Sequence, residues 1–89
     1  MRIDPSLISF VARSPRRMEI LTKLKGNSIS QPEIRKLTGM YKTHTSRTLN
    51  ELSEKELIFC INPKDREFKF YKITPKGKRV IDEIKRITS

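Results

Sequence analysis

A run of short polar and basic side chains follows Gly39 and holds the single histidine of the chain. The run reads Lys42-Thr43-His44-Thr45-Ser46-Arg47. Its hydroxyl, imidazole and guanidinium groups are the types that hydrogen-bond to base edges and phosphates. His44 has no Cys, Asp or Glu near it at metal-ligand spacing, so the chemistry that this run offers is hydrogen bonding, not metal binding.

The residues on either side of the run predict two helices joined by a turn. Ser30-Gln31-Pro32-Glu33 has the capping-box pattern, in which the serine and the glutamate satisfy free backbone amides at a helix start. Ile34 and Leu37 follow at helical spacing and predict an apolar face. Gly39 marks the turn, and we expect the second helix to run from about residue 42 to 55.

The second predicted helix separates into a buried face and an exposed face. Thr45, Leu49 and Leu52 fall at positions i, i+4 and i+7 and should face the core. The opposite face holds Thr43, Arg47, Asn50 and Glu54. Basic residues lie in the first half of this helix and acidic residues in the second. That polarity suits a helix whose N-terminal end approaches phosphate.

Two strands are predicted after this helix, at residues 57–61 and 68–73, on either side of the turn-forming residues 62–66. Pairing Asn62 with Glu67 would close a four-residue loop. That register places one apolar set on one face of the hairpin and another on the opposite face. The first set is Phe59, Ile61, Phe68 and Phe70, and the second is Ile58, Cys60, Tyr71 and Ile73. Because both faces are apolar, something must cover the first set.

Further helices are predicted from capping signals near both ends of the chain. Asp4-Pro5 and Ser14-Pro15 each combine an N-cap residue with proline at the first helical position. Thr74-Pro75 begins a final helix. The apolar stripes of the three helices are, in order, Leu7, Ile8, Phe10 and Val11; Met18, Ile20, Leu21 and Leu24; and Val80, Ile81, Ile84 and Ile87. Ile29 is expected to be a lone buried residue or a one-residue edge strand.

The length of 89 residues predicts one domain, residues 1–89. Its expected parts are an N-terminal helix (1–13), a helical core (15–56) with the helix–turn–helix at 30–55, a hairpin (57–74) and a C-terminal helix (75–88). Apolar residues make up only 35% of the chain. A core this small gains from dimerisation, so we expect a homodimer.

The charge balance predicts a polyanionic partner. Lys and Arg number 20 against 10 Asp and Glu, which gives a net charge of +10. Cys60 is the only cysteine, so one chain has no disulfide framework, and no signal peptide or membrane span is apparent. We expect a cytoplasmic protein that does not bind a membrane. Without converging acid–base groups or a glycine-rich phosphate loop, we expect no enzyme activity, no cofactor and no metal.

The order of these elements resembles the MarR- and ArsR-type winged-helix regulators of archaea and bacteria. The similar part runs from about residue 16 to 80, and the most telling stretches are 33–40, 45–52, 55–58 and 71–77. The resemblance implies an α+β winged helix–turn–helix fold and a homodimer that regulates transcription by binding double-stranded DNA. It places the second helix of the pair in the major groove and the hairpin, or wing, on the minor groove or backbone.

The resemblance also assigns roles to individual residues. Candidates for base contacts are Thr43, His44, Ser46, Arg47 and Asn50, whereas Lys42 would meet phosphate. In the wing, the backbone or minor-groove contacts would come from Lys64, Arg66 and Lys69. The sequence departs from the family pattern at two positions. Tyr41 stands where a small polar cap is usual, so Thr43 is an alternative cap that would shift the helix start by about two residues, and Thr45 stands where valine is usual.

The covering of Phe59, Ile61, Phe68 and Phe70 separates two hypotheses. In the first, the N-terminal helix or a second subunit buries them. In the second, they form a platform on which unpaired bases stack, and the chain binds single-stranded nucleic acid. The dimer surface is predicted to consist of Val80, Ile84 and Ile87 together with Leu7, Phe10 and Val11. Arg16 and Arg17, at the start of a helix, are weaker candidates for a phosphate contact.

Overall fold

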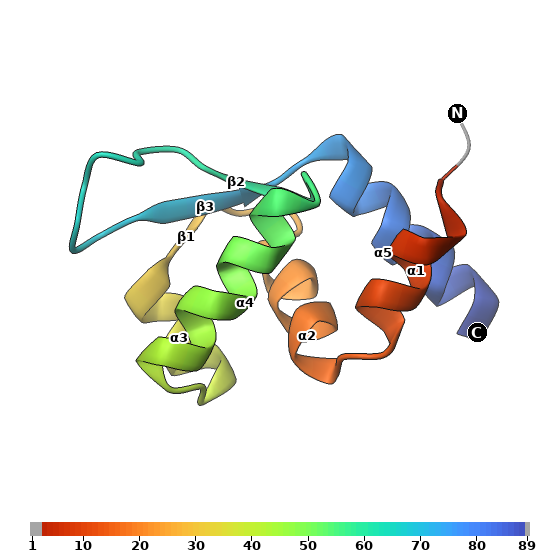
Figure 1. Ribbon diagram of the computed structural model, residues 1–89, viewed down its shortest axis with the longest axis horizontal. Coiled ribbons are helices and arrows are strands. Elements are labelled where there is room, and N and C mark those ends of the chain that lie inside the picture. The colour runs from red at the N-terminus through yellow and green to blue at the C-terminus, as the bar shows by residue number, and fades with distance from the viewer. Residues whose placement is uncertain (1–2, 89) are drawn as a thin grey trace.

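The computed structural model describes residues 3–88 and contains five helices and a small sheet (Figure 1). In chain order the elements are α1 (Pro5–Ala12), α2 (Pro15–Leu24), β1 (Ile29–Ser30), α3 (Gln31–Thr38), α4 (Lys42–Glu54), β2 (Ile58–Cys60), β3 (Phe70–Ile73) and α5 (Pro75–Thr88). The predicted α+β winged helix–turn–helix architecture is confirmed. The sheet differs from the prediction, because it has three strands where a two-stranded wing was expected.

Side-chain caps begin the first three helices where the sequence predicts. The Asp4 carboxylate accepts a hydrogen bond from the Ser6 amide at 2.9 Å, and the Ser14 hydroxyl accepts one from the Arg17 amide at 3.3 Å. At α3, the Ser30 hydroxyl accepts from the Glu33 amide at 3.3 Å. Each of these helices also has proline in its first turn, where the missing N–H leaves no intrahelical bond unmade.

The turn between α3 and α4 depends on a left-handed glycine. Gly39 adopts φ 72°, a conformation that other residues adopt only at a cost, and its N–H donates to the Arg35 carbonyl oxygen at 2.8 Å. Tyr41 is the N-cap residue of α4, although its side chain makes no capping hydrogen bond within the described residues. The helix therefore begins at Lys42, and the alternative in which Thr43 is the cap is wrong.

One hydrophobic core lies between the helices and one face of the sheet. Its fully buried side chains include Val11, Ile20, Leu21, Leu24, Ile34, Leu49, Leu52, Leu57, Val80 and Ile81. Helix α1 packs against both α2 and α5, which closes the core on the side away from the wing (Figure 1). A hydrogen bond from Lys25 on α2 to Asp82 on α5, at 2.7 Å, lowers the pKa of the Asp82 carboxyl.

This packing contradicts the predicted dimer surface. Leu7, Val11, Val80 and Ile84 are buried within the single chain, where α1 and α5 cover each other. The two terminal helices satisfy one another because both present apolar stripes at the same end of the molecule. Of the six predicted residues, Ile87 alone is largely exposed, at 63%. Leu37, predicted to face the core, is also exposed, and Thr38 is buried in its place.

Strand β3 is the centre of an antiparallel sheet with the order β1-β3-β2. Strand β1, just before α3, pairs Ile29 with Tyr71 and Ser30 with Phe70. The one-residue edge strand predicted at Ile29 is thus a short paired strand. It fastens the wing to the helix–turn–helix, because β1 leads directly into α3.

The register between β2 and β3 differs from the prediction by two residues. Ile58 pairs with Ile73 and Cys60 with Tyr71, so the loop across residues 61–69 is longer than the four residues expected. A shift of two residues keeps each side chain on its predicted face, since side chains alternate with a period of two. Ile58, Tyr71 and Ile73 accordingly lie in the core.

Candidate nucleic-acid interface

Helix α4 presents most of the predicted contact residues to solvent. Lys42, Thr43, His44, Arg47 and Asn50 are all exposed. Ser46 is half-buried, because its hydroxyl accepts a hydrogen bond from the Gln31 side chain at 2.7 Å. The N-terminal half of α4 is therefore an open face of hydrogen-bonding and cationic groups.

The opposite face of α4 anchors the helix through threonine and leucine side chains. Thr45 and Thr48 are buried, and their hydroxyls donate to the backbone carbonyl oxygens of Tyr41 and His44, each at 2.8 Å. Burying a hydroxyl without a partner would destabilise the fold, so these bonds let both threonines occupy buried positions. Leu49 extends the same buried face, as the spacing predicts.

The wing loop is held in shape by two polar side chains. The Asn62 amide donates to the Phe68 carbonyl oxygen at 2.8 Å and accepts from the Phe70 amide N–H at 2.7 Å. The Asp65 carboxylate accepts from the amides of Glu67 and Phe68, at 2.9 and 2.8 Å. These bonds replace ladder pairing along the loop. The loop can thus project Lys64 and Arg66, which are exposed.

The tertiary structure brings part of the predicted set together around one cavity of about 340 Å³. Lys42 and Ser46 from α4 and Arg66 and Lys69 from the wing all line it. The other predicted residues, Thr43, His44, Arg47, Asn50 and Lys64, do not. Two further lining residues of α3, Gln31 and Arg35, have a polar side chain facing this region that the sequence analysis did not identify. Their helical spacing of four would have placed them on one face of α3.

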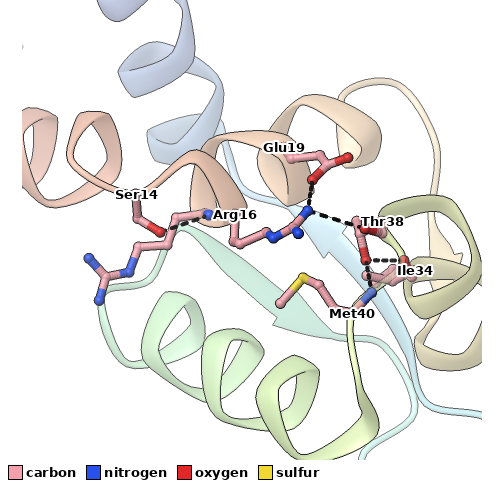
Figure 2. A network of polar contacts seen from close by, with 7 residues as sticks. Ser14, Arg16, Glu19, Ile34, Thr38 and Met40 are labelled. Carbon is pink, nitrogen blue, oxygen red and sulfur yellow. Dashed lines mark hydrogen bonds and ion pairs between the residues drawn. The ribbon is translucent and has the colours of Figure 1, made fainter.

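Arg16 and Arg17 both make hydrogen bonds within the protein, and the weak expectation that they contact phosphate stays a prediction. The Arg16 guanidinium donates to the Thr38 carbonyl oxygen at 3.2 Å and to Glu19 at 3.1 Å, next to the turn that precedes α4 (Figure 2). Arg17 bonds the Phe10 carbonyl oxygen at 2.8 Å and Glu51 on α4 at 3.3 Å. Arg16 thereby links α2 to the end of α3, and Arg17 links α2 to both α1 and α4.

The outer face of the wing is exposed within one chain. Phe59, Ile61, Phe68 and Phe70 retain between 40% and 53% of their accessible surface. Helix α1 does not cover them, because its apolar stripe packs against α2 and α5. That part of the first hypothesis is wrong, and we call this set the wing apolar face below.

Two negative findings concern the described residues, 3–88. None of their helices is both long and apolar enough to cross a membrane. Nor do three or more metal-ligating side chains gather anywhere in this range.

Solved structures with the same fold are transcriptional regulators of the MarR and ArsR types. A mutant of MarR from E. coli, complexed with operator DNA, matches with a TM-score of 0.78 and 18% identity, over 92% of this chain and 60% of that one. The regulator Tm0710 from Thermotoga maritima matches with a TM-score of 0.76 and 23% identity, over 91% and 58%. The chain thus spans about 60% of the length of these two relatives.

A third structure is closer in length. The homodimeric winged helix-turn-helix DNA-binding domain Mb0332 from Mycobacterium bovis matches with a TM-score of 0.68 and 22% identity, over 91% of this chain and 71% of that one. No match was found among curated proteins. The model of the HVO_A0261 N-terminal domain family matches residues 5–89. The chain therefore belongs to the HVO_A0261 N-terminal domain family and shares the winged-helix fold of the MarR- and ArsR-type regulators.

Proposed function

We propose that this chain binds double-stranded DNA as a transcriptional regulator, with α4 in the major groove and the wing on the backbone or minor groove. The observation that carries the proposal is the division of α4 into a buried anchor and an open cationic face. Lys42, His44 and Arg47 are exposed, whereas Thr45 and Leu49 are buried. A rigid helix with free polar tips is what direct readout of base edges requires.

The charges around α4 support the same orientation. Arg66 and Lys69 of the wing lie near the N-terminal half of α4, as their shared cavity with Lys42 indicates. In the acidic C-terminal half of α4, the Glu51 carboxylate accepts a hydrogen bond from Arg17 on α2 and does not line this cavity. In this orientation the basic half of α4 and the wing would lie next to the duplex. Neutralisation of DNA phosphates by such cations supplies much of the affinity of protein–DNA complexes.

We further propose that the chain acts as a homodimer, as Mb0332 does. Two copies related by a twofold axis would place two α4 helices on half-sites about one duplex turn apart. Exposed apolar surface remains for a partner on the wing apolar face and at Ile87, near the end of α5. Burial of the wing apolar face by a second subunit therefore remains a proposal, although burial by the N-terminal helix is excluded.

The competing function is single-stranded nucleic-acid binding by base stacking on the wing apolar face. Its support is the exposure of Phe59, Phe68 and Phe70 beside basic residues. The comparisons give this alternative no added weight, because the relatives named above are regulators and one of them is bound to operator DNA.

One experiment separates the two functions. A duplex selected from a randomised library and its separate strands are titrated by fluorescence anisotropy at two salt concentrations, and the mass of each complex is measured by light scattering. We expect tighter binding to the duplex and a mass of two chains per duplex. The Phe68→Ser/Phe70→Ser double variant, if it remains folded, should shift the mass of the duplex complex toward one chain per duplex, because the second subunit loses part of its contact surface. A preference for single strands that this variant abolishes would overturn the proposal.

A further inference from the structure

The cavity between α3, α4 and the wing carries an unbalanced set of charges. Arg35 of α3, Lys42 of α4 and Arg66 and Lys69 of the wing all line it, and Glu67 is the one acidic residue in its lining. Three separate elements thus bring cations to one hollow of about 340 Å³. The four cations that line the cavity repel one another, so an anion bound among them would lower the electrostatic free energy.

An unpaired donor of the Arg35 side chain is a second, independent indication that the cavity binds a ligand. Its Nε atom is buried and finds no hydrogen-bond acceptor in the described part of the chain. A buried, unpaired donor on a cationic group destabilises the fold unless something satisfies it. Guanidinium groups match the oxygens of a phosphate through paired N–H donors, which makes a phosphate group the fitting acceptor.

The walls of this cavity are fastened to one another. The Gln31 N–H donates to the Lys69 carbonyl oxygen at 2.8 Å, which holds the wing against the start of α3. The Gln31 side chain donates to the Ser46 hydroxyl at 2.7 Å, which holds α3 against α4. Pairing of Ser30 with Phe70 adds a third link. The three elements that carry the cations are therefore held together before an anion binds, which leaves only side chains to be ordered on binding.

We propose that this cavity is a phosphate-binding pocket in which Arg35, Lys42, Arg66 and Lys69 hold one phosphate group. This inference deepens the proposed function, because a phosphate of the DNA backbone is the occupant that a bound duplex would supply at this place. A free phosphate ion has the same chemistry, and the experiment distinguishes the two sources. Glu67 opposes the anion and keeps its affinity low when no duplex is present.

The pocket is tested first without DNA. Inorganic phosphate is titrated into the free protein, and amide chemical shifts are followed by NMR. We expect saturable shifts at residues 31–35, 42–46 and 66–69. Arg35→Gln should raise the apparent Kd by about tenfold or more, since a hydrogen bond between charged groups is lost. Lys42→Gln should raise it too, and Glu67→Gln should lower it.

Lys36→Gln is the matched control for Arg35→Gln. It removes the same charge from the same helix one residue further on, at an exposed position that does not line the cavity. Its Kd should change by less than about twofold, the size expected of a distant surface charge. Equal losses in the two variants, or shifts spread over the whole basic surface, would refute the pocket.

The second part of the test uses duplexes that carry a single uncharged methylphosphonate, moved step by step along the site. If the DNA backbone supplies the phosphate, a methylphosphonate at one position weakens duplex binding by the wild type but does not change duplex binding by Arg35→Gln. Inorganic phosphate should then compete with the duplex. If phosphate and duplex bind together, the occupant is a free phosphate. Failure of all duplex binding contradicts the proposed function, while the titration without DNA still decides the pocket.

Discussion

Arg47 is the residue through which sequence choice can be tested most directly. It is exposed on α4 and does not line the cavity. We predict that Arg47→Ala weakens binding to a selected duplex by roughly 1–3 kcal/mol and relaxes sequence preference, because a base contact is lost. Lys64→Ala, on the wing loop, should weaken binding to all duplexes alike. Competition titrations with selected and scrambled duplexes measure both effects.

Lys85→Ala is the control for these variants, since Lys85 is an exposed cation in the last turns of α5 and does not line the cavity. It should leave the affinity nearly unchanged. If Arg47→Ala bound selected and scrambled duplexes as the wild type does, α4 would not be the reading helix.

Glu56 adopts a backbone conformation that is strained for a residue with a Cβ atom. Its φ of 60° lies in the left-handed region, between the end of α4 and β2. That conformation costs a residue with a Cβ atom roughly 1–2 kcal/mol, and glycine avoids this at an entropic cost of about 0.5–1 kcal/mol. We predict that Glu56→Gly raises the free energy of unfolding by roughly 0.5–1 kcal/mol. Urea denaturation measures the change.

Lys55→Gly is the matched variant for Glu56→Gly. Lys55 has φ −84°, so glycine there brings the entropic cost and relieves no strain. It should lower stability. The ion pair lost with Glu56 is exposed, with 4.0 Å between Lys76 Nζ and Glu56 Oε1, and contributes little. A loss of stability in Glu56→Gly would contradict the explanation by backbone strain.

At the residue scale, the sequence predicted exposure well where helical spacing decides it and poorly where distant contacts decide it. Thr43, Arg47 and Asn50 were assigned to the open face of α4 from spacing alone, and they are exposed. Arg35 was missed because it lines a cavity together with residues of α4 and the wing, which are distant from it in the sequence. The link that Arg17 makes between α2 and α4 was not predicted, because its partner Glu51 lies on another helix. Roles in DNA binding stay predictions for every one of these side chains.

At the scale of elements, the close contact between α5 and the turn before β2 depends on Gly77. A Cβ atom at this position would collide with the Leu57 carbonyl oxygen and lie 2.8 Å from Ile73 Cγ1. The Leu57 carbonyl cannot easily move, because it accepts hydrogen bonds from the Thr74 N–H at 3.0 Å and from the Thr74 hydroxyl at 3.1 Å. The sequence Pro-Lys-Gly thus lets α5 start directly over the sheet.

We predict that Gly77→Ala lowers the free energy of unfolding by about 1–3 kcal/mol, the usual effect of overpacking a buried site. Thermal denaturation followed by circular dichroism measures the loss. Lys78→Ala, at the next and exposed position, should change stability by less than about 0.5 kcal/mol. A Gly77→Ala protein as stable as the wild type would mean that α5 can shift away from Leu57.

The elements themselves were largely predictable, because caps and turn residues are local signals. Asp4, Ser14, Ser30 and Gly39 mark helix ends in the sequence and do so in the structure. The hairpin register was wrong, since Asn62 and Asp65 stabilise a long loop through side-chain bonds that no pairing rule anticipates. Strand β1 was underestimated because two residues carry too little periodicity to identify a strand.

At the scale of the whole molecule, the net charge of +10 predicts a strong salt dependence of duplex binding. The logarithm of the binding constant should fall linearly with the logarithm of salt concentration, with a slope of roughly −0.9 for each phosphate neutralised. We predict that Lys64→Gln reduces the magnitude of this slope by about 1, whereas Lys85→Gln leaves it unchanged. An identical slope in the Lys64 variant would place the wing away from the backbone.

The overall fold was predictable from the order of elements, but the way the terminal helices are used was not. Apolar stripes on α1 and α5 suggested a surface for a second subunit. In the structure α1 and α5 pack against each other and against α2. A stripe in a sequence indicates that a helix face is buried, but it does not tell whether the partner is the same chain or another one.

The start of α1 and the end of α5 lie on the side of the molecule opposite the wing (Figure 1). A fluorescent label or a biotin group attached near the end of α5 would therefore leave α4 and the wing loop accessible to solvent. Optical sensors and single-molecule tethers built in this way should report DNA capture without blocking it. A label at Asp65 would instead lie on the wing loop, within the surface that is proposed to contact DNA.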